Sequence, residues 1–168
     1  MAGRIDINYE SVEAMLYYWH ALKDKEKVPE KFIYDIAEMA GLRDAYEQEF
    51  DGESVRRALS AIKNHEVFTS RTKKEARFWN NNLWMMEDLS YTDAMVQPIK
   101  TLNLDDLAAE GPELEVIFAP LHFDDYVIKG NKLIINFFKI KPQNGAAFVN
   151  EHELKDFIRG KLSFTQSS

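Results

Sequence analysis

The hydrophobic pattern of this chain changes its period near Ser90, and that change limits the folds open to it. Before Ser90, apolar residues recur at helical spacing, whereas short alternating or continuous apolar runs predominate after it. Helical patterns followed by strand patterns are typical of an α+β fold. We therefore expect an N-terminal helical layer of four to five helices, then a small, mostly antiparallel sheet of three to four strands, and a C-terminal helix.

Apolar stripes predict five helices in the first part of the chain. Gly41 is placed to end the second of them in a left-handed turn. Thr72 and Glu75 form a capping-box pattern at the start of the fifth. Because the fifth carries two apolar stripes, we expect it at the centre of the helical layer. The predicted helices cover residues 9–23, 29–41, 42–50, 55–62 and 72–89.

A hairpin is the best-defined strand feature after Ser90. The pair Gly130-Asn131 favours a tight turn between the apolar runs 126–129 and 132–140. Residues 133–138 are apolar on both faces, so we expect other elements to cover each side of this strand.

Three further elements are predicted around this hairpin. Residues 94–101 read as a strand, and the alternation within 114–118 predicts a strand with one wet face near a sheet edge. Asn150 is placed to cap a final helix, with Glu153 at its third position.

Size and composition favour one domain. With 168 residues and 45% hydrophobic content, the chain can bury a core without disulfides or metals. We expect a single compact domain, 1–168, with a soft seam near residue 90 between a helical part (1–90) and a strand-rich part (91–162), followed by a loose tail, 163–168. The chain lacks cysteine and any run apolar enough for a signal peptide or membrane span, so we expect a soluble cytoplasmic protein.

The sequence lacks the common motifs of catalysis and cofactor binding. Its seven glycines are scattered, so there is no Walker or dinucleotide loop, and no serine stands in a Gly-x-Ser-x-Gly turn. The four histidines are far apart in sequence, and none pairs with another at helical metal-ligand spacing. We therefore expect neither a cofactor nor a metal.

His122 with Asp124 is the catalytic candidate. A carboxylate beside an imidazole can orient it and raise its basicity for general base work. In an extended segment, His122 and Asp124 share a face while Asp125 points away, so the three groups do not converge. A solvated loop or the entry to a strand is the alternative, and we favour it.

A basic run is the second candidate. Residues 53–77 carry seven basic and three acidic groups, against a net charge of −7 for the chain. Cations in the first turn of a helix oppose its macrodipole, and an anion or acidic partner bound there would relieve that cost. The alternative is neutralisation by carboxylates of the fold itself, such as Glu66 and Glu75. The candidate anion- or partner-binding residues are Arg56, Arg57, Arg71, Lys73, Lys74 and Arg77.

Two weaker patterns complete the set. Residues 36–50 have a helix-turn-helix spacing, but the would-be recognition helix carries three acids and one base, which would repel phosphates. Asn80, Asn81 and Asn82 span most of a helical turn, so at least one should face the interior and, like Asn136, require hydrogen-bond partners. Such amides could line a polar pocket, or they could form only the hydrogen bonds that the fold itself requires.

Without a catalytic motif, the first functional hypothesis is a non-enzymatic protein-interaction or regulatory domain, whose partner is another protein or a second copy of the chain. The alternative is a small-ligand-binding protein or an enzyme with a polar pocket. A nucleic-acid-binding regulator is the third hypothesis, although the net charge of −7 disfavours nucleic acid as a partner. No membrane partner is expected.

Overall fold

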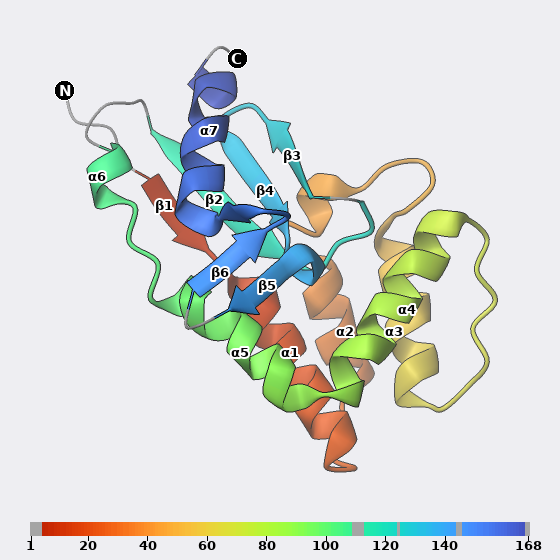
Figure 1. Ribbon diagram of the computed structural model, residues 1–168. Helices are drawn as coiled ribbons and strands as arrows, with labels where there is room; N and C mark the ends of the chain where they lie inside the picture. The colour runs from red at the N-terminus through yellow and green to blue at the C-terminus, as the bar shows by residue number, and fades with distance from the viewer. Residues whose placement is uncertain (1–4, 109–112, 124, 144–145, 167–168) are drawn as a thin grey trace.

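The computed structural model describes residues 5–108, 113–123, 125–143 and 146–166, and it confirms the α+β class (Figure 1). Its helices are α1 (Glu10–Lys23), α2 (Glu30–Ala37), α3 (Gly52–Lys63), α4 (Lys73–Glu87), α5 (Leu89–Lys100), α6 (Asp105–Ala108) and α7 (Leu154–Gln166). Its strands are β1 (Ile5–Asn8), β2 (Leu114–Ala119), β3 (Tyr126–Lys129), β4 (Lys132–Asn136), β5 (Ile140–Gln143), β6 (Ala146–Val149) and β7 (His152–Glu153). None of the helices in these ranges combines the length and apolar character needed to cross a membrane.

Two sheets share one hydrophobic core. The larger has the strand order β1-β2-β4-β3, with β2 parallel to both β1 and β4, and with β3 antiparallel to β4. The smaller sheet, β5-β6-β7, is antiparallel. The predicted hairpin is confirmed, since Lys129 pairs with Lys132 across Gly130-Asn131. Both faces of β4 are buried, with α7 among the elements packed against it.

The prediction that residues 94–101 form a strand is wrong. This segment belongs to helix α5, which Asp88 caps by accepting a hydrogen bond from the Tyr91 amide at 3.1 Å. Its buried residues recur at helical spacing, and Pro98 lies near the C-terminal end of the helix. The buried residues are Thr92, Met95, Val96 and Ile99.

Two other placements differ from expectation. Strand β2 lies between β1 and β4, so the predicted edge position is wrong. Helix α4 is not the centre of the helical layer either, because it buries only three side chains and leaves Trp84 70% exposed. The centre is α1, whose contacts reach α2, α4, α5 and β2.

Two predicted helices are shorter than expected. The segment 42–50 holds a single 3₁₀ turn, Arg43–Ala45, and a bridge between Glu47 and Phe50. The second helix ends at Ala37, although Gly41 does adopt the predicted left-handed conformation, with φ of 92°. A side chain there would collide with Ala119, since an added Cβ would lie 2.7 Å from its Cβ.

The last helix begins later than predicted. Asn150 has a positive φ of 58° and precedes β7, so it does not cap α7, and Glu153 lies in that strand. Helix α7 starts at Leu154 and continues to Gln166, into the segment that the sequence suggested would be loose.

Two consecutive residues of α1 fix it to the neighbouring helices. The Tyr18 hydroxyl donates to the Leu59 carbonyl of α3 at 2.6 Å, and the Trp19 indole N–H donates to the Asn82 side chain of α4 at 3.0 Å. Trp19 also stacks on Phe137, with ring centroids 6.0 Å apart. All four of the side chains involved, Tyr18, Trp19, Asn82 and Phe137, are fully buried.

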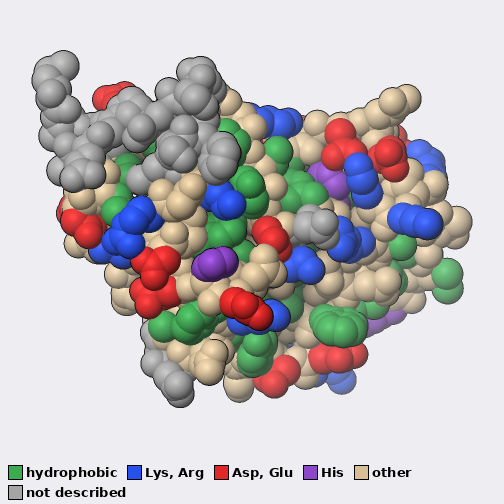
Figure 2. All heavy atoms as spheres, turned by 45° about the horizontal axis from the view of Figure 1, so that its top comes forward, with side chains coloured by type: hydrophobic (Ala, Val, Ile, Leu, Met, Phe, Trp, Pro, Cys, Tyr) green, Lys and Arg blue, Asp and Glu red, His purple; other side chains and the backbone are tan. Residues whose placement is uncertain are grey.

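Charged side chains cover the outside of this core. Figure 2 shows basic and acidic groups interspersed over one face of the molecule, with hydrophobic side chains between them. Charged side chains of the fold also pair with one another, as Lys155 does with Asp106 at 2.8 Å and Lys132 with Asp44 at 3.2 Å. An exposed ion pair contributes little to stability.

We expect Asn82→Leu to destabilise the protein by about 2 kcal/mol, because the buried Trp19 N–H would lose its acceptor. The matched control is Asn80→Leu two residues earlier on the same helix, where the side chain is exposed and a change within about 0.5 kcal/mol is expected. Urea denaturation followed by tryptophan fluorescence measures both. Equal losses in the two variants would show that the Trp19–Asn82 bond does not hold α1 to α4.

Candidate functional site

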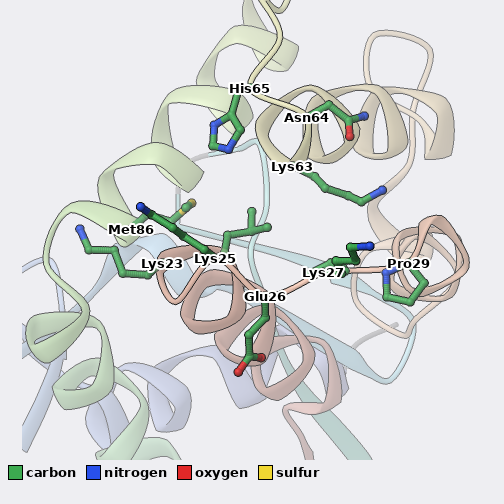
Figure 3. Close-up of a pocket in the computed structure, with 11 residues that line it drawn as sticks. Lys23, Lys25, Glu26, Lys27, Pro29, Lys63, Asn64, His65 and Met86 are labelled. Atoms are coloured by element: carbon green, nitrogen blue, oxygen red, sulfur yellow. The ribbon is translucent and has the colours of Figure 1, made fainter.

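A cavity of about 800 Å³ lies where the C-terminal ends of α1 and α3 meet the last turn of α4 (Figure 3). We call it the cap pocket. Its volume falls within the range of small-molecule sites. It is lined by Leu22, Lys23, Lys25, Glu26, Lys27, Val28, Pro29, Lys63, Asn64, His65 and Met86.

The end of α1 is closed by a pair of backbone hydrogen bonds. The Lys25 amide donates to the Leu22 carbonyl at 3.1 Å, and the Glu26 amide donates to the Ala21 carbonyl at 2.8 Å. These two bonds define a Schellman motif, in which the residue after the cap adopts a left-handed conformation. Lys25 accordingly has a φ of 61°.

The end of α3 repeats this geometry. The His65 amide donates to the Ile62 carbonyl at 3.2 Å, the Glu66 amide donates to the Ala61 carbonyl at 2.8 Å, and His65 has a φ of 56°. The two ends also match in sequence, Ala-Leu-Lys-Asp-Lys-Glu at 21–26 against Ala-Ile-Lys-Asn-His-Glu at 61–66. The cap pocket is therefore framed by two equivalent helix ends.

Lysine is unfavourable in such a left-handed position, and histidine is less so because it is enriched among the non-glycine residues that adopt it. Glycine is the usual residue there, and an L-residue with a side chain pays roughly 1–2 kcal/mol for the conformation. Strain of this kind persists at functional sites, where the side chain itself is needed. Both strained residues, Lys25 and His65, line the cap pocket.

Four lysines surround the cap pocket, and the fold neutralises one of them. Lys63 lies 3.0 Å from the Glu30 carboxylate, which also accepts from the Ser60 hydroxyl at 2.8 Å. The hydrogen bond from Lys63, and then that from Ser60, hold the pKa of Glu30 below its usual value. Within the described residues, Lys23, Lys25 and Lys27 form no ion pair.

The side chains around the cap pocket divide into a charged rim and an apolar surface. Figure 3 shows Lys23 and Lys25 on the Met86 side, Lys27 and Lys63 on the Pro29 side, and the His65 imidazole pointing into the space between the helix ends. The Glu26 carboxylate points away from His65. The apolar contribution comes from Leu22, Val28, Pro29 and Met86. Such an arrangement can hold an anion that carries an apolar body.

None of the six cations of the predicted basic run lines the cap pocket, and the fold pairs several of them with its own carboxylates. Arg71 lies 3.1 Å from Glu53, and Lys74 is bonded to Glu47. Arg56 lies over the Tyr34 ring at 5.3 Å, Lys73 is exposed, and Arg77 makes further interactions of its own. Anion or partner binding by Arg56, Arg57, Arg71, Lys73, Lys74 and Arg77 stays a prediction.

Glu75 pairs with Arg57, one cation of the predicted basic run. Its side chain is buried and accepts from the Ser54 hydroxyl at 2.6 Å, the Arg71 amide at 2.7 Å and the Arg57 guanidinium at 3.1 Å. Burial alone would raise the pKa of Glu75, but these hydrogen bonds outweigh it and the pKa is lowered. Thr72 caps α4 as predicted, whereas Glu75 turns inward to Arg57 and Ser54.

His122 is buried instead of solvated. Its ring stacks on Phe50 at 4.0 Å between centroids, and its Nε2 lies 3.1 Å from the Glu47 carboxylate. Burial is the main cause that lowers the pKa of His122, so the imidazole is held neutral more strongly than usual. Nδ1 has no hydrogen-bond partner among the described residues. Asp124 lies outside the described residues, and its pairing with His122 stays a prediction.

The structure also tests the two weaker sequence patterns, the helix-turn-helix spacing within 36–50 and the buried asparagines. The would-be recognition helix that the sequence already disfavoured does not form, since 43–50 holds a 3₁₀ turn and the bridge between Glu47 and Phe50. Asn82 is buried, as predicted for at least one of Asn80 to Asn82, and Asn136 is buried as well. The fold satisfies both: Asn136 accepts from the Leu121 amide at 3.0 Å and donates to the Phe123 carbonyl at 2.6 Å. In the described part of the chain, no group of three or more potential metal ligands is present.

Sequence reasoning missed the cap pocket for two reasons. The segment Lys23-Asp24-Lys25-Glu26-Lys27 alternates in sign, so its net charge drew no attention. The shared pattern of 21–26 and 61–66 is too short to stand out as an internal repeat. The signal that could have found the site is this recurrence, with lysine in one sequence and histidine in the other at the position where glycine would normally end a helix.

We expect Lys25→Gly and His65→Gly each to stabilise the protein by about 1 kcal/mol, because glycine removes the left-handed strain. The matched control is Asn150→Gly at a φ of 58°, where asparagine already tolerates the conformation and a smaller gain is expected. Urea denaturation measures all three. If Lys25→Gly and His65→Gly both lose stability, these side chains stabilise the fold itself.

No protein-family model, curated protein or solved structure matches this chain. The strongest features are the two equivalent helix ends, the strained Lys25 and His65, and the cavity that these ends frame.

Proposed function

We propose that this protein is a non-enzymatic binding protein whose ligand, an anionic molecule with an apolar body, occupies the cap pocket. The observation that carries the proposal is the pair of equivalent helix ends, which bring the strained Lys25 and His65 side chains to one cavity of about 800 Å³. Small-molecule sites are concave and mostly apolar, with a few convergent polar groups, and the cap pocket fits that description.

Conformational strain supports the proposal. A chain selected only for stability would carry glycine at positions 25 and 65, since that change is expected to stabilise the fold. Retaining Lys25 and His65 at both positions is consistent with a role for their side chains. The apolar residues Leu22 and Met86 give the ligand a surface to cover.

The protein-interaction hypothesis from the sequence concerns a different part of the molecule, the basic run at the start of α4. There, Arg57, Arg71 and Lys74 are each paired with a carboxylate of the same chain, which reduces what they can offer a partner. At the cap pocket, three lysines have no such pair among the described residues. This difference favours the cap pocket. A cytoplasmic location stays a prediction.

The test is isothermal titration calorimetry with octanoate and with uncharged octanol, a pair of probes that differ in the anionic group. We expect octanoate to bind with 1:1 stoichiometry and octanol to bind more weakly. The double variant Lys25→Gln/Lys27→Gln should weaken octanoate binding by roughly 3- to 10-fold, because each exposed charge contributes up to about 1 kcal/mol.

Two single variants serve as controls. Lys31→Gln removes an exposed lysine outside the cap pocket and should leave binding unchanged. Lys73→Gln does the same within the basic run. Unchanged affinity in the double variant, or an equal loss in Lys73→Gln, would contradict the assignment of binding to the cap pocket.

A further inference from the structure

We infer that the anionic group taken by the cap pocket is a phosphate monoester rather than a carboxylate. This inference rests on the proposed function and names the ligand's chemistry. Three features of the pocket support it: the amount of positive charge that the fold leaves uncompensated, the chemical type of the cations, and the directions from which they reach the cavity.

Charge is the first feature. Lys23 and Lys63 lie in the last turns of α1 and α3, where cations offset the partial negative charge of a helix C-terminus, and Lys63 is also paired with Glu30. Lys25 stands directly after the cap of α1 and Lys27 two residues beyond it, and neither pairs with a described carboxylate. A phosphate monoester carries a charge of about −1.5 to −2 near neutral pH, whereas a carboxylate carries one negative charge. The phosphate matches this charge more closely.

The chemical type of the cations is the second feature. Among the described residues that line the pocket, the basic side chains are lysines and His65, and no arginine is present. The planar fork of arginine binds carboxylate and phosphate alike, through two parallel hydrogen bonds. The lysine ammonium is a compact charge with three rotatable donors, and it binds phosphate as a point charge. A pocket built from lysine does not require a planar ligand group.

Direction is the third feature. Figure 3 shows Lys25 on the Met86 side of the space and Lys27 on the Pro29 side, with His65 between them. Donors on two sides can be satisfied together by a tetrahedral group that presents three terminal oxygens. A carboxylate has only two oxygens in one plane. The apolar residues Leu22 and Met86 then remain for the organic part of the ester.

The experiment compares octyl phosphate with octanoate by calorimetry at pH 7.5, with the wild-type chain. We expect octyl phosphate to bind roughly 5- to 10-fold more tightly, because one further charge is compensated. The ratio should fall close to one in Lys25→Gln/Lys27→Gln and stay unchanged in Lys31→Gln. Circular dichroism checks that each variant is folded.

The outcomes separate this inference from the proposed function. Equal binding of the two probes, or tighter binding of octanoate, overturns the phosphate assignment and leaves the proposed function in place. Failure of both probes to bind overturns the proposed function. Inorganic phosphate is the third probe, and binding as tight as that of octyl phosphate would contradict a role for the apolar body.

Vesicles identify the source of the phosphate. Sedimentation with phosphatidylcholine vesicles containing phosphatidic acid, but not with vesicles containing phosphatidylserine at equal charge, would support the phosphate assignment with a lipid headgroup as its source. Binding of octyl phosphate without sedimentation would support a soluble phosphate ester. Equal sedimentation with both vesicles would contradict recognition of a phosphate monoester.

Discussion

Tyr18 and Trp19 of α1 provide the constraint on which the rest of the helical layer depends. They are consecutive, fully buried, and bonded to two different helices, Tyr18 to the Leu59 carbonyl of α3 and Trp19 to Asn82 of α4. Burial raises the pKa of Tyr18, so its hydroxyl remains a hydrogen-bond donor. Two buried polar groups that must find partners therefore fix α1 against both neighbours.

The position of the cap pocket follows from this constraint. Tyr18 and Leu59 stand shortly before the two helix ends, so bonding them brings those ends to the same part of the molecule. Asn82 stands one helical turn before Met86, and its bond to Trp19 brings that turn of α4 to the pocket. A site on the surface is thus held by hydrogen bonds in the core, which gives it the rigid support that binding sites require.

The sequence predicted those elements whose signals are local. Residues 9–23 carry a complete apolar face, and Gly130-Asn131 has a composition specific to tight hairpins, so α1 and the β3–β4 hairpin were both found. Residues 94–101 were misjudged because β-branched and apolar residues beside Pro98 resemble a strand, while the deciding signals were the Asp88 cap and burial by the rest of the fold. The parallel pairing of β1 with β2 joins segments more than 100 residues apart, and no local pattern reports it.

The candidate site was harder to predict because its chemistry depends on backbone conformation. A lysine after a helix is ordinary, and only a positive φ shows that Lys25 and His65 occupy glycine-like positions. The predicted basic run has the opposite character: its charge is obvious in sequence, but buried Glu75 and the neighbouring Glu53 and Glu47 compensate several of its cations. Counting charges along a chain does not show which of them the fold has already paired.

The central claim is that ligand binding occurs at the paired ends of α1 and α3. The most direct test is a two-dimensional ¹H–¹⁵N NMR titration of the labelled protein with octyl phosphate. The largest shift changes should fall on the amides of residues 22–28, 63–65 and 86. Changes concentrated at residues 71–77, or spread evenly over the molecule, would contradict the claim.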